Sequence, residues 1–243
     1  MRKADTAMNI EGKKAVVFGG TSGIGLATVK MLAQGGASVV AVSRDPSKSG
    51  PLPSGVAAKY CDVRDAAAVE ALLNETGPID ILVSAATGGK RAIGPFVDMD
   101  IDGFKGSFDK LWGYANVVRF GARHVTDGGS ITLLSGSPAR EFPKELSALS
   151  AVGGAVEAFM RTVAKEIAPR IRINVVSPGL IDTPMFAQAD AAKRVEDFKT
   201  MSRGNLIPRA GTADEVAEAV MFVIKNDFVT GTIVDVDGGS LLS

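Results

Sequence analysis

The feature that most constrains this chain is a glycine-rich turn, Gly19-Gly20-Thr21-Ser22-Gly23-Ile24-Gly25, between a short apolar run and a helical pattern. Residues 15–18 are typical of a buried strand, and apolar residues recur at helical spacing over 24–32. Gly35-Gly36 then ends the helix, and residues 38–42 are typical of a second strand. A strand, a glycine turn, a helix and a strand within about 30 residues predict a βαβ unit.

Each glycine of the turn has a physical reason to be there. Gly19 permits the tight turn that leaves the strand, Gly23 lets backbone approach a pyrophosphate, and Gly25 lets the helix pack closely on the sheet. The free N–H groups and the dipole of the helix N-terminus favour phosphate. A bare turn with glycines for geometry alone is the alternative, but the strand–turn–helix context favours dinucleotide binding. The predicted contacts in the turn are Gly19, Thr21, Ser22, Gly23, Ile24 and Gly25.

The rest of the chain continues to alternate between strands and helices. Further strands are predicted at 56–61, 79–83, 130–134, 171–176 and 232–236, and helices at 66–75, 104–125, 146–167 and 213–224. This order predicts one doubly wound α/β Rossmann domain over residues 1–243, with a single parallel sheet of about seven strands and helices on both faces. We expect residues 1–8 to be a flexible extension, and roughly 181–208 to be an irregular substrate loop or lid.

The composition excludes several classes of partner. Lys plus Arg and Asp plus Glu are each 27, so the zero net charge argues against a nucleic-acid or anionic membrane partner. No run of about 18 apolar residues predicts a membrane-spanning helix. The single cysteine, Cys61, precludes an intrachain disulfide and fits a reducing compartment, so we expect a cytoplasmic protein. No cluster of His, Cys and carboxylates has metal-ligand spacing, and no metal is predicted.

The residues after the second predicted strand bear on the choice of cofactor. A carboxylate there binds the adenosine ribose hydroxyls and selects NAD. This chain instead has Ser43-Arg44, followed by Asp45. An arginine at this place can hold the 2′-phosphate of NADP, although it can also be an ordinary solvated side chain. We predict NADP, held by Ser43 and Arg44, and keep NAD as the alternative because of Asp45.

The chain resembles the short-chain dehydrogenase/reductase family over nearly its whole length. The glycine turn looks like the family's glycine motif, and Leu82-Val83-Ser84-Ala85-Ala86 stands where the family usually has Leu-Val-Asn-Asn-Ala. Residues 172–179 look like the strand and Pro-Gly turn beside the nicotinamide, and residues 237–239 match the C-terminal segment. The resemblance implies further cofactor contacts at Asp62, Val63, Ser84, Ala85, Ala86, Pro178, Gly179, Ile181 and Thr183.

The family resemblance also implies a catalytic Asn, Ser, Tyr and Lys, and here the chain departs from the family. Leu149 aligns with the tyrosine, and Gly153 aligns with the lysine. Gly136 falls at the serine and Lys110 at the asparagine. The usual phenol, which exchanges the proton while a hydride moves, is therefore missing from its aligned position.

Lys110 is the residue we predict to act instead. A lysine close to a cationic nicotinamide ring would have a lowered pKa and could serve as acid or base; the alternative is a structural salt bridge or a hydrogen bond to backbone. Ser135 and Ser137 could orient a carbonyl, or simply cap the loop. Neither tyrosine of the chain precedes a lysine by four residues; Tyr60 is expected near the adenine, and Tyr114 packed against a neighbouring helix or subunit.

Three functions remain open at this point. The first is an NADP-dependent oxidoreductase that acts on a small carbonyl or alcohol with a displaced acid. The second is a catalytically inactive dinucleotide-binding protein with a cofactor-sensing or regulatory role. The third uses the same pocket for reduction of a polarised C=C bond or for an elimination. The family resemblance implies a homodimer or homotetramer in each case.

Overall fold

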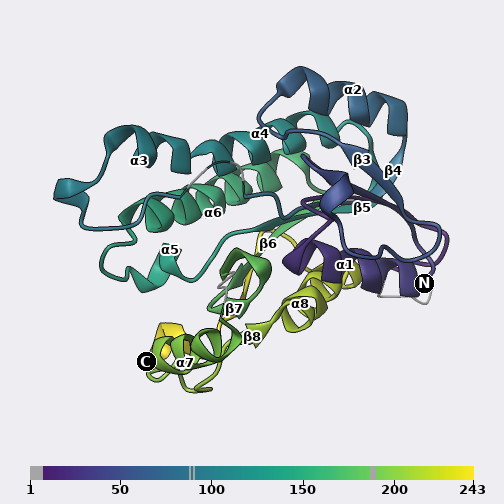
Figure 1. Ribbon diagram of the computed structural model, residues 1–243. Coiled ribbons are helices and arrows are strands. Elements are labelled where there is room, and N and C mark those ends of the chain that lie inside the picture. The colour runs from purple at the N-terminus through teal and green to yellow at the C-terminus, as the bar shows by residue number, and fades with distance from the viewer. Residues whose placement is uncertain (1–7, 88, 90, 187–189) are drawn as a thin grey trace.

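The computed structural model describes residues 8–87, 89, 91–186 and 190–243. Of the predicted extension over residues 1–8, only Met8 lies within the described residues, and its backbone N–H donates to the carbonyl oxygen of Lys225 at 2.7 Å. Figure 1 shows a central sheet with helices above and below it. None of the helices among these residues is long and apolar enough to cross a membrane.

The main sheet has seven parallel strands in the order β3-β2-β1-β4-β5-β6-β9. The strands are β1 (Lys14–Phe18), β2 (Ser38–Ser43), β3 (Ala57–Tyr60), β4 (Ile79–Ser84), β5 (Val125–Leu134), β6 (Arg172–Pro178) and β9 (Ile233–Val236). The chain builds outward from β1 in one direction and from β4 in the other. This confirms the predicted doubly wound sheet, and it places a topological switch point between β1 and β4, where such folds bind ligands.

Helices cover both faces of the sheet because alternate strand residues point to opposite sides. Val16 and Phe18 pack in one core against α2 (Ala66–Thr76), α4 (Asp109–Gly121) and α6 (Ser147–Ile167). Ala15 and Val17 pack in the other core, against α1 (Gly23–Gln34) and α8 (Ala213–Lys225). The interior strands β1, β2, β4 and β6 are thus largely buried on both faces, as their continuous apolar runs indicated, whereas the edge strands β3 and β9 are more exposed.

The helix predicted at 104–125 is wrong in its bounds. Two helices stand there instead, α3 (Ile101–Ser107) and α4, which meet at Phe108. The helix α3 begins early because the Asp100 carboxylate caps it, accepting from two backbone N–H groups. It ends where the Ser107 hydroxyl donates back to the carbonyl oxygen of Gly103, a bond that competes with helical pairing. Residue 125 already belongs to β5, five residues before the predicted start of that strand.

Residues 181–208 are also more regular than predicted. A two-residue strand, β7 (Ile181–Asp182), pairs with β8 (Gly211–Thr212), and the helix α7 spans Ala191–Met201. The Asp190 side chain caps α7, and Phe198 anchors it with an edge contact of 5.7 Å between its ring and that of Phe186. A role for this segment as a lid stays a prediction.

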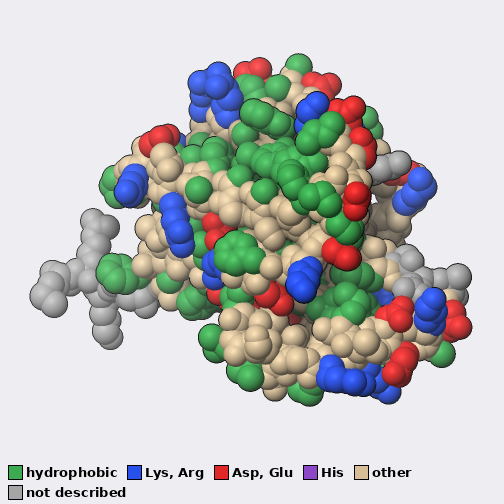
Figure 2. All heavy atoms as spheres, turned by 90° about the vertical axis from the view of Figure 1, so that its left-hand side faces the viewer, with side chains coloured by type: hydrophobic (Ala, Val, Ile, Leu, Met, Phe, Trp, Pro, Cys, Tyr) green, Lys and Arg blue, Asp and Glu red, His purple; other side chains and the backbone are tan. Residues whose placement is uncertain are grey.

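The face that carries α3, α7 and the short helix α5 (Pro138–Glu141) is shown in Figure 2. Hydrophobic side chains gather in the upper half of this view, and charged side chains lie around them, along the top edge as well as below. The segment that joins β4 to α3 and the first residue of α3 carry exposed apolar side chains, among them Ile93, Phe96, Val97 and Ile101.

Candidate active site

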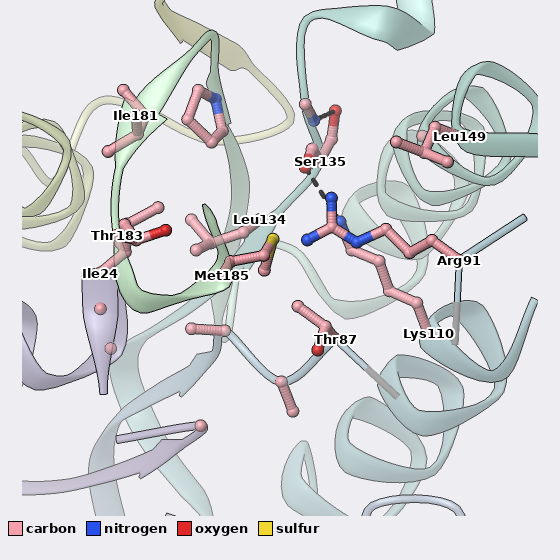
Figure 3. A pocket seen from close by; sticks show the side chains of 18 of the residues that line it. Ile24, Thr87, Arg91, Lys110, Leu134, Ser135, Leu149, Ile181, Thr183 and Met185 are labelled. Atoms are coloured by element: carbon pink, nitrogen blue, oxygen red, sulfur yellow. Dashed lines mark hydrogen bonds between the residues drawn. The ribbon is translucent and has the colours of Figure 1, made fainter. Parts of the chain in front are cut away.

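A cavity of about 900 Å³ lies at the carboxyl ends of the central strands. It is lined by the glycine turn before α1, the loops that follow β2, β4, β5 and β6, and the first turns of α6. Its position at the switch point between β1 and β4 is the ordinary position of a ligand site in this architecture. Figure 3 shows the part of the cavity where residues from α4, β5 and the loop after β4 meet.

The glycine turn is held in a geometry that excludes side chains. Gly19 has φ +77°, and a Cβ there would lie 2.7 Å from the backbone nitrogen of Ala86. A Cβ on Gly25 would lie 2.0 Å from the carbonyl oxygen of Gly19. The residue before α1, Ser22, makes no side-chain capping hydrogen bond, so no side chain satisfies the first N–H groups of the helix. These features fit a pyrophosphate at the helix N-terminus.

At the end of β2, the pocket wall is polar and carries two basic residues and one acidic residue. Ser43, Arg44, Asp45 and Lys48 all line it. The Asp45 carboxylate accepts from the Ser47 hydroxyl at 2.5 Å and pairs with the Lys48 ammonium at 2.7 Å. The hydrogen bonds from Lys48 and Ser47 hold the pKa of Asp45 below its usual value. Arg44 forms no salt bridge with an acidic residue in the part of the chain that the structure describes.

Two predicted cofactor contacts do not reach the pocket. Val63 and its neighbour Cys61 line it, but the intervening Asp62 turns toward Arg64, to which its carboxylate pairs at 2.6 Å. Ser84 is fully buried within β4 and is not in the lining. The following Ala85 and Ala86 do line the pocket, because the chain leaves the sheet after Ser84.

The remaining predicted cofactor contacts surround one side of the cavity. Pro178 and Gly179 follow β6, and Ile181 and Thr183 extend that wall, so all four line the pocket. Figure 3 shows Ile181 and Thr183 beside Ile24 of α1, across the cavity from Lys110. The structure therefore brings the glycine turn and the Pro-Gly segment together, although some 150 residues separate them in the sequence.

Lys110 lies on α4 with its side chain in the pocket. Its Nζ donates to the backbone carbonyl oxygen of Ser135 at 2.9 Å and lies 5.7 Å from the centre of the Tyr114 ring. Burial, together with the charge of Arg91, lowers the pKa of Lys110 to about 7. The hydrogen bond to backbone is the structural alternative that the sequence left open, and the cause of the lowered pKa is burial with Arg91 rather than a nicotinamide ring. A catalytic role for Lys110 stays a prediction.

The two serines line the pocket but donate to carboxylates. The Ser135 hydroxyl donates to Glu157 Oε1 at 2.8 Å and accepts from the backbone N–H of Gly136. The Ser137 hydroxyl donates to Glu141 Oε2 at 2.8 Å. As the structure stands, each serine has only a hydroxyl oxygen to offer to a ligand.

Leu149 and Gly153 of α6 both line the cavity, and Figure 3 shows Leu149 opposite the Ile181 wall. Gly153 packs so closely on α5 that a Cβ there would lie 2.8 Å from the Cβ of Ala139. The adjacent Gly154 has open space where a Cβ would stand. This wall of the pocket is therefore apolar, and it is tightly packed at Gly153.

The comparisons with known proteins agree with this geometry. A small-chain dehydrogenase whose structure was solved in complex with NADPH superposes with a TM-score of 0.85; it is 34% identical, and the match covers 96% of this chain and 100% of that one. A family model described as enoyl-(acyl carrier protein) reductase matches residues 19–240. The chain is a short-chain dehydrogenase/reductase.

Relatives of this short-chain dehydrogenase/reductase carry oxidoreductase names. An uncharacterized oxidoreductase of Methylorubrum extorquens is 32% identical over 247 residues, which cover 95% of this chain and 98% of that protein. The cis-4-hydroxycyclohexanecarboxylate dehydrogenase of Sinomonas cyclohexanicum is 34% identical over 241 residues, covering 93% of this chain and 95% of the relative.

Two pocket residues of this short-chain dehydrogenase/reductase, Tyr114 and Arg91, were not predicted as parts of the site, and neither was Glu157, which lies outside the pocket lining but contacts Ser135. Tyr114 is fully buried within the chain and lines the pocket, and burial raises the pKa of its phenol. Glu157, 4% exposed, supports Ser135 and lies 3.3 Å from Arg140 Nε. Its only sequence signal was one acidic residue on the apolar face of a helix. Arg91 lies in the loop after β4, where a lone basic residue gives no pattern.

No group of three or more His, Cys, Asp or Glu side chains in the described part of this short-chain dehydrogenase/reductase is placed to hold a metal ion. Burial raises the pKa of the Cys61 thiol to about 11, which makes it a poor nucleophile near neutral pH.

Proposed function

We propose that this chain is an NADP(H)-dependent oxidoreductase that interconverts a small carbonyl compound and its alcohol, with Lys110 as the proton donor and acceptor. The observation that carries the proposal is the Lys110 ammonium, which lies in the pocket with a pKa of about 7. A group with a pKa near the working pH can both give and take a proton.

The assignment of NADP as the cofactor rests on two parts of the pocket, the glycine turn before α1 and the residues at the end of β2. The N-terminus of α1 and the glycines that admit no Cβ suit a pyrophosphate, and Arg44 and Ser43 suit a 2′-phosphate. Asp45, the residue that left NAD open, is engaged by Lys48 and Ser47. The solved relative in complex with NADPH supports the same choice. NADPH, when bound, supplies a hydride to the substrate carbon.

The chain's own residues handle the proton and the surroundings. Lys110 Nζ donates a proton to the carbonyl oxygen as negative charge develops there, while Ser135 holds the ammonium in place through its backbone carbonyl. Leu149, together with Met185 and Phe186 of the predicted substrate loop, gives the cavity an apolar wall that limits water.

The proposal also includes a difference from the catalytic residues that the family resemblance implies. Leu149 and Gly153 offer neither a phenol nor an ammonium at the aligned positions. An inactive cofactor-binding protein would have no need of a cation with a lowered pKa in the pocket, and this observation favours the enzyme.

The test is a panel of ketones and aldehydes assayed with NADPH. We expect turnover by the native chain and a loss of at least about 100-fold in Lys110→Met, the usual scale of a general acid. The matched control is Lys105→Met, which removes an exposed lysine of α3 and should leave the rate unchanged. Turnover that survives in Lys110→Met would remove the proposed acid, and no turnover on any member would favour the inactive binder.

We also propose a homodimer or homotetramer, as the family resemblance implies, and a cytoplasmic location, which the single cysteine fits. Trp112 on α4, 64% exposed, supports an interface at that helix. Sedimentation of the native chain and of Trp112→Ala tests it: we expect an oligomer that the substitution weakens.

A further inference from the structure

We propose that Arg91 and Lys110 form an anion-binding pair, and that the substrate is an oxo acid whose carboxylate binds to the Arg91 guanidinium while its carbonyl oxygen faces Lys110. This inference rests on the proposed function, because it names the substrate class of the same pocket.

The first observation is the placement of two cations side by side. Both residues line the cavity, Arg91 from the loop after β4 and Lys110 from α4. Figure 3 shows the Arg91 guanidinium reaching the middle of the pocket, next to the Lys110 ammonium and close to Ser135. Two positive charges that lie side by side repel each other, and this repulsion costs free energy unless an anion binds between them.

The second observation is that no carboxylate in the described part of the chain forms a salt bridge with either member of the pair. Among the described residues, Arg91 forms no salt bridge, whereas Arg64, Arg140, Arg170, Arg194 and Arg209 each do. The two nearby acids are engaged elsewhere. Glu157 accepts from Ser135 and Arg140, and Glu141 accepts from Ser137.

The third observation is the character of the surrounding walls. The same cavity is also lined by apolar side chains, namely Ile93, Leu146, Leu149, Val152 and Met185. A polar anion with many oxygens would leave its lone pairs against these apolar side chains. A carboxylate offers two oxygens in one plane, which matches the planar guanidinium, and its hydrocarbon portion can cover the apolar wall.

The separate roles follow from the chemistry of the two cations. A guanidinium stays charged throughout the working pH range, so Arg91 serves as a permanent anchor for the carboxylate. Lys110 can lose its proton and therefore serves the reacting oxygen. The anchor also decides which end of the substrate enters first, because the Ile181 and Thr183 wall opposite is uncharged.

The binding test uses carboxylates that cannot react. Cyclohexanecarboxylate and hexanoate are titrated by calorimetry into the chain with and without NADPH, and the uncharged amides of both serve as matched ligands. We expect each acid to bind at least about 30-fold more tightly than its amide. In Arg91→Met this preference should fall to within about threefold. Lys144→Met, which removes an exposed lysine outside the pocket lining, should keep the preference.

The turnover test uses 4-oxocyclohexanecarboxylate and its methyl ester with NADPH. We expect kcat/KM to favour the acid in the native chain and Arg91→Met to abolish that ratio. Acid binding that depends on Arg91 without turnover of either compound supports the anion site and rejects the proposed oxidoreductase function. Reduction of both compounds at equal rates, with no acid preference in binding, overturns the anion site and leaves the proposed function standing. Inorganic phosphate that displaces the acids at equal concentration overturns the assignment to carboxylate.

Discussion

Lys110 Nζ donates a 2.9 Å hydrogen bond to the backbone carbonyl oxygen of Ser135, and so ties α4 to the end of β5 at the centre of the pocket. The bond fixes the position of the ammonium but uses only one of its three protons. The remaining N–H groups are free to meet a substrate oxygen. Substitutions of Lys110 can therefore test the effect of its charge separately from the effect of its position.

The first prediction concerns the pH dependence of reduction. The pKa of Lys110 is about 7, so its protonated, proton-donating form disappears as pH rises above that value. We expect kcat/KM for carbonyl reduction to fall about tenfold for each pH unit above 7. Lys110→Arg keeps the cation without the titration, and its slower reaction should be level from pH 6 to 9. A profile with the same fall in Lys110→Arg would assign the titration to another group.

The second prediction concerns stability. An unfolded lysine has a pKa of about 10.4, whereas burial lowers that of Lys110 to about 7. Between these values the unfolded chain binds more protons than the folded one, so the stability of the native protein rises with pH across this window. The free-energy cost of burying the protonated Lys110 side chain is fully present below pH 7 and is relieved near pH 10. Lys110→Met should stabilise the fold by about 2 to 4 kcal/mol at pH 6.5 and by far less at pH 10. Urea unfolding at the two pH values measures this, and an equal gain at both would contradict the cause.

The third prediction concerns cofactor choice. Arg44→Ala should weaken NADPH binding by roughly 10- to 100-fold, because a charge-assisted bond to the 2′-phosphate is lost. It should change NADH binding by less than about threefold. Asp45→Ala should not weaken NADH binding, since that carboxylate is held by Lys48. Calorimetric titration of both cofactors into the native chain and the two variants measures these affinities. Equal affinities of the native chain for NADPH and NADH would contradict the preference for NADP.

The fourth prediction uses two adjacent glycines of α6. Gly154→Ala should stabilise the protein by up to about 1 kcal/mol, because the added methyl group meets open space and alanine favours helix. Gly153→Ala should destabilise it by about 1 to 3 kcal/mol, because its Cβ would press on Ala139. Denaturant midpoints of the two variants provide the comparison. A gain in stability in both variants would show that α5 moves to accommodate the added methyl group at position 153.

The fifth prediction follows from the proposed carboxylate site. Lys110 faces Arg91, which carries positive charge, and the phenol of Tyr114; Glu157 and Glu141 lie near but are paired. A bound carboxylate adds negative charge and should raise the pKa of Lys110. At pH 8 binding of cyclohexanecarboxylate should then take up part of a proton. Calorimetry in two buffers of different ionisation enthalpy measures this uptake, which Lys110→Met should abolish.

The fold was largely predictable because its signals are local. Continuous apolar runs marked the buried strands, and the glycine turn needed only its own neighbours to be interpreted. The errors arose where one side chain redirected the backbone. Asp100 and Ser107 divided a predicted helix, and Asp190 started a helix within a predicted loop. A single polar residue of this kind gives little periodic signal.

The site was predictable only in part. The glycines and the Pro-Gly turn carry geometric requirements that can be read in the sequence. The pairing of Asp62 with Arg64, by contrast, is a side-chain contact that no sequence pattern predicted, and Asp62 does not line the pocket. Arg91 joined Lys110 because a loop and a helix converge in space. The sequence separation of residues 91 and 110 does not predict that their side chains lie in the same pocket.

The contact between Gly153 and Ala139 bears on how this pocket can change over evolutionary time. A mutation that placed lysine at position 153 would bring its Cβ to within 2.8 Å of the Ala139 methyl group. A single substitution at position 153 would therefore strain the packing of α6 on α5 unless position 139 also changed. This wall of the pocket can change only through coupled substitutions on the two helices, whereas the neighbouring Gly154 can change alone.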